Sequence, residues 1–327
     1  MVDLPQREDY PPDMWNNLKQ QLRDAVRPRA AKRHWMRLLA LTALALWCLS
    51  GRTEALAPGS ASAAPPSGGF VQLAQLPAEA ALDLRALMAA YPDFVLGMER
   101  GASGKLKLVL ADGARLVYDD GAPRTQKQAE ESPDIRTMLA QVYPLGPVTE
   151  QTSHPQHGFD PGRHRVQAFF LALYGHNEAQ VRKHCRAVTF DGHAPLFSTR
   201  HGAADALARV WARLAPQVAA HPEWAPVLRP FGGTLCWRNI AATTRLSVHS
   251  FGAAIDLNEE LAYWLTDPHP ETVPARVLAF PAEIVAAFEA EGFIWGGKWA
   301  AFDLMHFEYR PELILKARLL RGEAMPG

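Results

Sequence analysis

The stretch that decides the fold runs from residue 247 to residue 258 and reads Ser-Val-His-Ser-Phe-Gly-Ala-Ala-Ile-Asp-Leu-Asn. Gly252 lets the chain turn sharply between His249 and Asp256, and the two alanines after it leave room for a close backbone approach. Residues 253–258 are predicted to form a strand that fixes the aspartate. The sequence therefore predicts a loop and a strand that present an imidazole and a carboxylate to one place.

A second segment with the same kind of chemistry lies at residues 303–308 and reads Asp-Leu-Met-His-Phe-Glu. Residues 304–309 are predicted to form another strand, which brings His306 to the first pair. Two histidines and one aspartate are typical of a catalytic zinc site, because they leave a fourth coordination position open for water. We therefore predict one Zn²⁺ per chain, bound by His249, Asp256 and His306.

Two carboxylates, Asp303 and Glu308, flank His306 in the sequence. Strand positions three apart point to opposite faces, so Asp303 faces the metal only from the turn before the strand. From that turn it can accept a proton from the activated water and pass it to the leaving amine. Glu308 shares a face with His306 and is either the alternative base or a hydrogen-bond partner of a ligand histidine.

Size and composition limit the classes of function. The chain has 327 residues, enough for one large or two modest domains, and its 34 basic residues balance its 34 acidic ones. Because basic residues do not outnumber acidic ones, the chain lacks the excess positive charge typical of proteins that bind nucleic acid, and no nucleic-acid partner is expected. Three cysteines do not make a disulfide scaffold. Cys185 and Cys236 form either one bridge or two separate thiols.

The N-terminal part has the features of an export signal. Residues 1–37 are basic in character, residues 38–50 form an apolar run, and residues 51–69 form an Ala-, Ser-, Pro- and Gly-rich linker. The run is short for a membrane-spanning helix, which needs about 20 apolar residues, and fits a signal-peptide core. It is either cleaved, with translation starting at Met36 as one alternative, or kept as a membrane anchor. Both interpretations predict a periplasmic or extracytoplasmic protein, secreted or anchored to the inner membrane by residues 38–50.

The exported part is predicted to be α+β. Residues 181–320 should form a small central antiparallel sheet flanked by helices and carrying a single zinc site. Within them, residues 203–220 and 281–291 are predicted helices, and residues 235–240 a further strand. Residues 70–165 are predicted to be a small α+β accessory region whose role the sequence does not assign.

The two motifs resemble those of zinc metallopeptidases that include VanY-type D-Ala-D-Ala carboxypeptidases and phage L-alanyl-D-glutamate endopeptidases. The shared pattern is Ser-x-His-x-x-Gly-x-Ala-x-Asp followed by Glu/Asp-x-x-His, and the resemblance covers about residues 181–315. The matching positions are Ser247, His249, Gly252, Ala254, Asp256, Asp303 and His306. The resemblance implies that zinc binds to the two histidines and Asp256, and that Asp303 is the catalytic acid/base.

The same resemblance implies residues that contact substrate. An arginine that stabilises the oxyanion is expected, and we assign this role to Arg238, because a guanidinium stays charged; the alternative is a structural ion pair. Arg245 is expected to bind a substrate carboxylate or to form an ion pair. Ser247 is expected to bind substrate or to steady the ligand loop. Trp295, in the run Trp-Gly-Gly-Lys-Trp, is assigned to the substrate cleft, with a core position as the alternative.

Together with the export signal, the resemblance implies an exported zinc metallopeptidase that hydrolyses peptide bonds in peptidoglycan stem peptides, as a carboxypeptidase or an endopeptidase. Its expected partners are peptidoglycan peptides, and the membrane if the N-terminal segment is uncleaved. The alternative is a non-catalytic zinc-containing module that binds the cell wall. Asp303 argues against this alternative, because a scaffold does not need that carboxylate.

Overall fold

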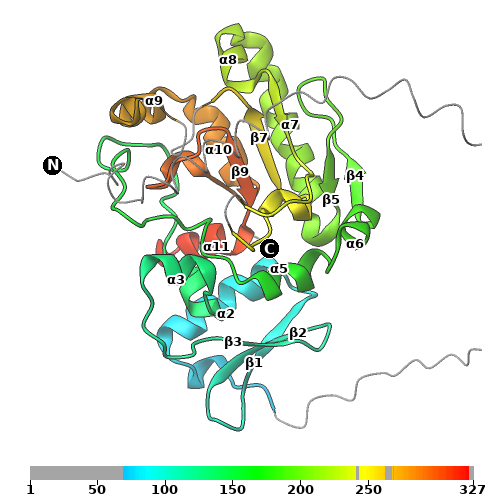
Figure 1. Ribbon diagram of the computed structural model, residues 1–327, viewed down its shortest axis with the longest axis vertical. Helices are drawn as coiled ribbons and strands as arrows, with labels where there is room; N and C mark the ends of the chain where they lie inside the picture. The colour runs from blue at the N-terminus through cyan, green and yellow to red at the C-terminus, as the bar shows by residue number, and fades with distance from the viewer. Residues whose placement is uncertain (1–68, 241–242, 262–266, 268, 324–327) are drawn as a thin grey trace, which may run out of the picture. The chain divides into compact units, whose positions relative to one another are not determined.

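The computed structural model describes residues 69–240, 243–261, 267 and 269–323 (Figure 1). All of them belong to one compact unit, in which helices are mixed with antiparallel sheets, so the α+β prediction is confirmed. The predicted segments 1–37, 38–50 and nearly all of 51–69 lie outside the described residues. Among the described residues, no helix has the length and apolar character needed to span a membrane.

The central sheet carries the residues of the two motifs. Its four antiparallel strands lie in the order β6 (Phe231–Gly233), β7 (Ala254–Asn258), β9 (His306–Tyr309) and β8 (Phe293–Trp295). The register places Asp256 of β7 directly opposite His306 of β9. Because cross-strand neighbours are about 5 Å apart at their Cβ atoms, this pairing alone brings two predicted ligands together.

The two faces of this sheet have different partners. Ile255, Leu257 and Phe307 point to a core formed with α7 (Ala203–Ala220) and α10 (Ala282–Ala290), two helices that the apolar spacing predicted. The alternate positions, which include Asp256 and His306, point to the other face, since side chains of a strand alternate. The polar site is therefore separated from this helical core by the sheet itself.

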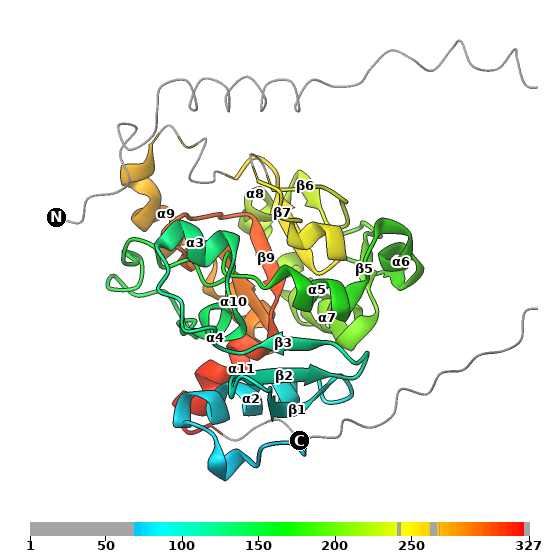
Figure 2. The ribbon, with the colours of Figure 1, turned by 60° about the horizontal axis from the view of Figure 1, so that its bottom comes forward.

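The N-terminal region, residues 70–165, packs against the C-terminal helix. It contains α2 (Ala78–Ala90), the three-stranded antiparallel sheet β1 (Val95–Arg100), β2 (Leu106–Leu110) and β3 (Arg115–Val117), and the short helices α3 (Gln126–Glu131) and α4 (Ile135–Leu139). Figure 2 shows α2 beside α11 (Pro311–Leu320), and their side chains share one hydrophobic core. This core includes residues on both sides of position 181, where the sequence predicts the metallopeptidase domain to begin.

Buried polar pairs reinforce this contact. The Lys316 ammonium of α11 lies 2.5 Å from the Asp83 carboxylate of α2, and Tyr91 donates a hydrogen bond to Glu312 at 2.7 Å. All four side chains are buried. Buried charges and hydroxyls are tolerated only with such partners, so the N-terminal region is built to fit α11.

Short elements complete the unit. They comprise α5 (Gln167–Tyr174), α6 (Glu178–Lys183), the paired strands β4 (Cys185–Ala187) and β5 (Leu196–Ser198), α8 (Ala225–Leu228), α9 (Val273–Ala279), and the 3-10 turns η2 (Leu73–Gln75), η3 (Arg200–Gly202), η4 (Pro222–Trp224), η5 (Val248–Phe251), η6 (Pro270–Thr272) and η7 (Gly296–Lys298). Cys185 and Cys236 are free thiols.

The strand predicted at residues 235–240 is wrong. These residues form a loop with one isolated bridge, between Asn239 and Leu246. The reason is local: the Ser250 hydroxyl accepts the N–H of Arg238 at 3.0 Å and donates to its carbonyl at 2.9 Å. A side chain therefore takes the backbone groups that a strand would pair.

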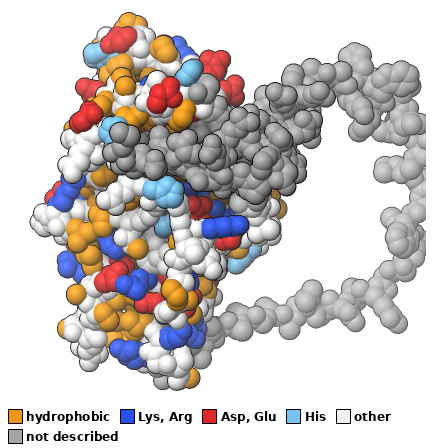
Figure 3. All heavy atoms as spheres, turned by 60° about the vertical axis from the view of Figure 1, so that its left-hand side comes forward, with side chains coloured by type: hydrophobic (Ala, Val, Ile, Leu, Met, Phe, Trp, Pro, Cys, Tyr) orange, Lys and Arg blue, Asp and Glu red, His pale blue; other side chains and the backbone are white. Residues whose placement is uncertain are grey.

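Both kinds of charge occur on the face drawn in Figure 3. Asp and Glu side chains are more frequent in its upper part and Lys and Arg side chains in its lower part, with hydrophobic side chains between them.

Candidate metal centre

A capped turn positions His249. It lies in η5, a 3-10 turn whose first N–H groups are capped by Ser247; the Ser247 hydroxyl accepts the N–H of His249 at 3.4 Å. The turn ends at Gly252 with φ 60°, where a Cβ would lie 3.2 Å from the sulfur of Cys185. Of the two roles considered for Ser247, the structure shows the steadying of the ligand loop.

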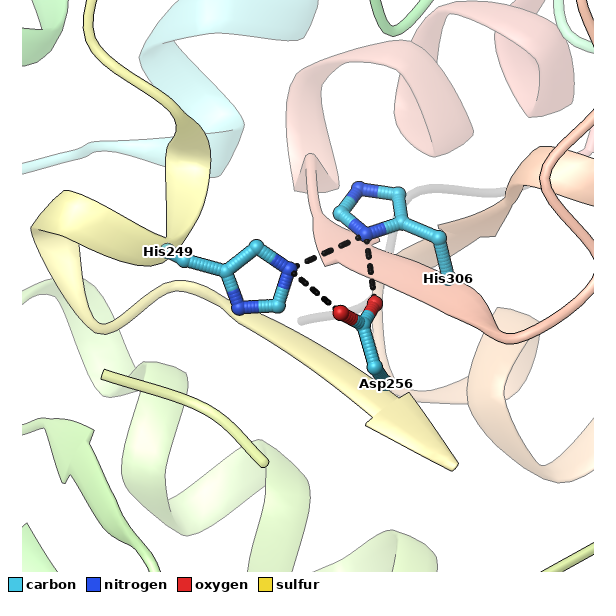
Figure 4. Close-up of side chains that lie close together, drawn as sticks. All are labelled: His249, Asp256 and His306. Carbon is cyan, nitrogen blue, oxygen red and sulfur yellow. Dashed lines mark hydrogen bonds and ion pairs between the residues drawn. The ribbon is translucent and has the colours of Figure 1, made fainter. Parts of the chain in front are cut away.

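Three side chains converge above the sheet (Figure 4). His249 Nε2 lies 3.2 Å from an Asp256 oxygen, His306 Nδ1 lies 3.0 Å from the other oxygen, and the two nitrogens are 3.2 Å apart. Tetrahedral zinc with bonds of 2.0–2.1 Å separates its ligand atoms by roughly 3.3 Å. The donor types and their spacing therefore fit a single zinc ion.

The other nitrogen of each imidazole already has a partner. His249 Nδ1 lies 2.6 Å from the carbonyl oxygen of Thr234, and His306 Nε2 lies 3.4 Å from a Glu308 oxygen. Both partners are acceptors, so the hydrogens belong on these outer nitrogens and the lone pairs face the centre. Partners of this kind fix the ring orientation of metal-binding histidines.

The charges of the site favour a cation. Burial opposes the charged form of Asp256, but the two neighbouring imidazoles outweigh it and lower the pKa of this carboxylate below its usual range. Burial likewise opposes a charged His306, yet hydrogen bonds to Asp256 and Glu308 raise its pKa to about 10. Without a metal the site therefore holds a proton, in a place that a cation can take over.

Asp303 lies where the strand geometry required it. It is in the turn that leads into β9, where its N–H donates to the carbonyl of Gly296 at 3.0 Å and its carbonyl accepts the N–H of His306 at 3.2 Å. Its Oδ1 is buried without a hydrogen-bond partner among the described residues. Burial, together with the charge of Asp256, raises the pKa of Asp303 to about 6. A carboxyl group of this pKa is suited to acid/base chemistry near neutral pH.

Glu308 has a supporting position. It is fully buried behind His306, 3.2 Å from Arg310 and 3.6 Å from Arg165. Burial raises its pKa, but His306 and the two arginines lower it to about 2. A carboxylate held ionised by three cationic or donor groups is a poor proton carrier. Of its two predicted roles, the structure therefore favours the partner of His306 over the alternative base.

The comparisons with known proteins identify the same part of the chain. Residues 241–309 match the model of a peptidase family described as D-alanyl-D-alanine carboxypeptidase. The matched segment is similar to a peptidase. It contains the three convergent ligands and Asp303. No curated protein and no solved structure matches the chain.

The two arginines assigned to substrate lie on opposite sides of the start of the matched segment. Arg238 is exposed in the loop before η5, and its carbonyl also accepts the N–H of Ser247 at 3.0 Å, which ties this loop to the ligand loop. Arg245 is half-buried; it pairs with Glu130 at 3.5 Å and donates to the carbonyl of Arg163 at 3.0 Å. The structure thus shows the ion-pair alternative for Arg245.

Trp295 requires a correction. Its side chain is fully buried between Phe280 and Phe307, and its indole N–H donates to the carbonyl of Leu304 at 2.9 Å. It belongs to the helical core and cannot line a cleft in this conformation. The aromatic residue of the same run that contacts the candidate metal centre is Trp299, whose ring meets His306 edge to face at 5.7 Å between centroids.

Sequence reasoning missed two groups that act through the ligands. Thr234 orients His249 through a backbone carbonyl, and Arg165 contacts Glu308 behind His306. Every residue has a backbone carbonyl, so the residue type at position 234 does not indicate that its carbonyl accepts a hydrogen bond from His249. Arg165 lies far from either motif, in the run Arg-His-Arg, which suggests surface charge rather than a buried partner.

Proposed function

We propose that the protein is an exported zinc peptidase that hydrolyses peptide bonds in peptidoglycan stem peptides. The observation that carries this proposal is the set of two imidazole nitrogens and one carboxylate, spaced at 3.0–3.2 Å, inside the segment that matches the D-alanyl-D-alanine carboxypeptidase family. The acid/base candidate Asp303 lies in the same segment.

The residues that would hold the metal are His249, Asp256 and His306. Bound there, Zn²⁺ supplies a water of lowered pKa, about 7, and polarises the scissile carbonyl. Asp303 takes the proton of the attacking water as the new C–O bond forms. It then delivers a proton to the amine nitrogen as the C–N bond breaks. Arg238 provides a positive charge for the oxyanion that develops on the carbonyl oxygen.

The description of the matched family names D-alanyl-D-alanine, and this supports peptidoglycan stem peptides as the substrate class. We place the protein in the periplasm or outside the cytoplasm, secreted or anchored to the inner membrane by residues 38–50. Its partners are then peptidoglycan peptides, and the membrane when the anchor is retained. Carboxypeptidase action removes one terminal residue, whereas endopeptidase action divides the stem, so product masses separate the two.

The test is digestion of purified muropeptides by the full chain, followed by mass analysis of the products. We expect cleavage that a chelator abolishes and added Zn²⁺ restores, and that His249→Ala removes. The matched control is His176→Ala, which changes an exposed histidine away from the site. Undiminished cleavage by His249→Ala would rule out the mechanism. Metal binding without cleavage of any muropeptide would instead identify a non-catalytic wall-binding module.

A further inference from the structure

Residues 159–165 read Phe-Asp-Pro-Gly-Arg-His-Arg and end the N-terminal region. They lie well outside the matched segment, residues 241–309, and carry none of the motif residues. We call them the 159–165 segment. The structure brings them into contact with residues on both sides of Asp303, as the following contacts show.

Three hydrogen bonds join this segment to the stretch just before the turn of the acid/base candidate. The carbonyl of Phe159 accepts the N–H of Ala300 at 2.8 Å, and a carboxylate oxygen of Asp160 accepts the N–H of Ala301 at 2.7 Å. Arg163 donates from Nη2 to the carbonyl of Ala301 at 3.0 Å. The backbone of Ala301 is thus held on both its donor and its acceptor side.

Gly162 allows the segment to come this close. A Cβ placed on it would lie 2.2 Å from the ring of Trp299 and 2.5 Å from a carboxylate oxygen of Glu308. Both distances are far below van der Waals contact. The backbone of Gly162 is not in the left-handed region, so the requirement for glycine is steric rather than conformational.

Arg165 and Arg163 each contact a neighbour of His306. Arg165 forms an ion pair with Glu308 at 3.6 Å, and its guanidinium also donates to the carbonyl of Gly162. The guanidinium of Arg163 lies 5.7 Å from the ring centroid of Trp299, the residue that meets the His306 ring edge to face. The orientation of His306 therefore depends on two side chains that the 159–165 segment holds.

We infer that the 159–165 segment is a positioning element of the metal centre. Through Glu308 and Trp299 it sets the orientation of His306, and through Ala301 it fixes the turn that carries Asp303. The part concerning Asp303 rests on the proposed function. The part concerning His306 is a statement about metal binding and stands without it.

The first test is Gly162→Ala in the full chain. Zn²⁺ affinity is measured by competition with a fluorescent chelator, and the fold of the metal-free protein by circular dichroism. We expect the affinity to fall about 10- to 100-fold, as when partners of ligand residues are changed. The matched control is Gly101→Ala, whose Cβ meets only the flexible end of Lys107, at 3.0 Å, and should bind Zn²⁺ as the parent does.

A second set of variants decides the question if Gly162→Ala does not fold. Arg165→Met should lower Zn²⁺ affinity about 10-fold, and Arg165→Lys should restore most of it by returning the charge to Glu308. Arg163→Met should lower Zn²⁺ affinity only a few-fold, because it loses the contact with Trp299 but leaves Glu308 paired with Arg165. It should lower kcat up to about 100-fold at unchanged KM, because its hydrogen bond to Ala301 holds the turn of Asp303.

Unchanged Zn²⁺ affinity in Arg165→Met, or equal losses in Arg165→Met and Arg165→Lys, would overturn the inference. If the parent protein binds Zn²⁺ but cleaves no muropeptide, the proposed function fails, and the affinity measurements still decide the role of the 159–165 segment.

Discussion

The strand pair β7–β9 and the N-terminal region differ in whether sequence motifs indicate their role. The strand pair and the turns that lead into it carry the three candidate ligands and Asp303 within short motifs, and the matched segment covers them. The N-terminal region carries no motif, yet it supplies Gly162, Arg163 and Arg165 to the surroundings of His306. The residues that perform the proposed chemistry and the residues that hold them in place are encoded in distant parts of the chain.

A second buried cluster strengthens the same comparison. Glu289 of α10 accepts a hydrogen bond from Tyr143 at 2.8 Å and from the N–H of Gly146 at 2.9 Å. Lys298 pairs with Glu289 and donates to the carbonyl of Pro144 at 2.8 Å. Lys298 directly precedes Trp299, so this cluster ties the N-terminal region to the approach of the metal site.

The largest effect is expected on the strand side of the comparison. Asp303→Asn keeps the shape of the side chain but cannot exchange the proton, so kcat for muropeptide hydrolysis should fall about 10²- to 10⁴-fold. Zn²⁺ binding, measured by metal content after gel filtration, should persist, because the three ligands are unchanged. Asp112→Asn, in an exposed turn, serves as the control. Full turnover in Asp303→Asn would move the acid/base role to another group.

The contact between the N-terminal region and the approach to the metal site should contribute to the free energy of unfolding. Lys298→Met leaves Glu289 buried without its cation, and breaking such a pair costs about 3–5 kcal/mol. Urea unfolding at neutral pH measures this loss. The control Lys127→Met removes an exposed pair with Glu131, with 81% of the lysine side chain accessible, and should cost less than about 0.5 kcal/mol. Equal losses in the two variants would mean that the cluster does not tie the regions together.

The last prediction concerns the pH dependence of stability and tests the candidate ligands themselves. The pKa of His306 is raised to about 10 in the metal-free protein, so the folded state holds a proton that the unfolded chain releases near pH 6.5. This stabilisation is complete below pH 6.5 and is lost as pH rises through 10. Thermal unfolding in chelator should show stability falling over that range. A flat profile would contradict the His306–Asp256–Glu308 arrangement.

Added Zn²⁺ supplies the matching control for this titration. The metal replaces the proton between the ligands, so its affinity should increase with pH over the same interval. The zinc-loaded protein should then lose the alkaline decline that the metal-free protein shows.

The sequence predicted the ligand strands well, because their information is local. The alternation in residues 253–258 fixes which side chains face the core, and β7 follows it. The turn of Asp303 followed from the same two-residue period. The assignment of Trp295 failed because the run Trp295–Trp299 contains two tryptophans, both buried. Only the packing of Phe280 and Phe307 decides that Trp295 is the one in the helical core.

The supporting residues could not be predicted, because their partners are remote. Glu308 could be placed on the face of His306, but its role depends on Arg165, which lies in another part of the chain. Glu312 and Lys316 resemble surface charges of a helix, and they are buried only because α2 offers Tyr91 and Asp83.

The position of α11 also bears on the order in which the molecule can be completed. During synthesis α2 leaves the ribosome early, whereas the helix that covers it is made only when residues 311–320 have been added. Until α11 has been made, the Asp83 carboxylate lacks its Lys316 partner and the apolar side of α2 lacks the helix that covers it. The core around α2 is therefore completed long after α2 itself is made, and a truncation ahead of α11 would leave the apolar side of α2 exposed.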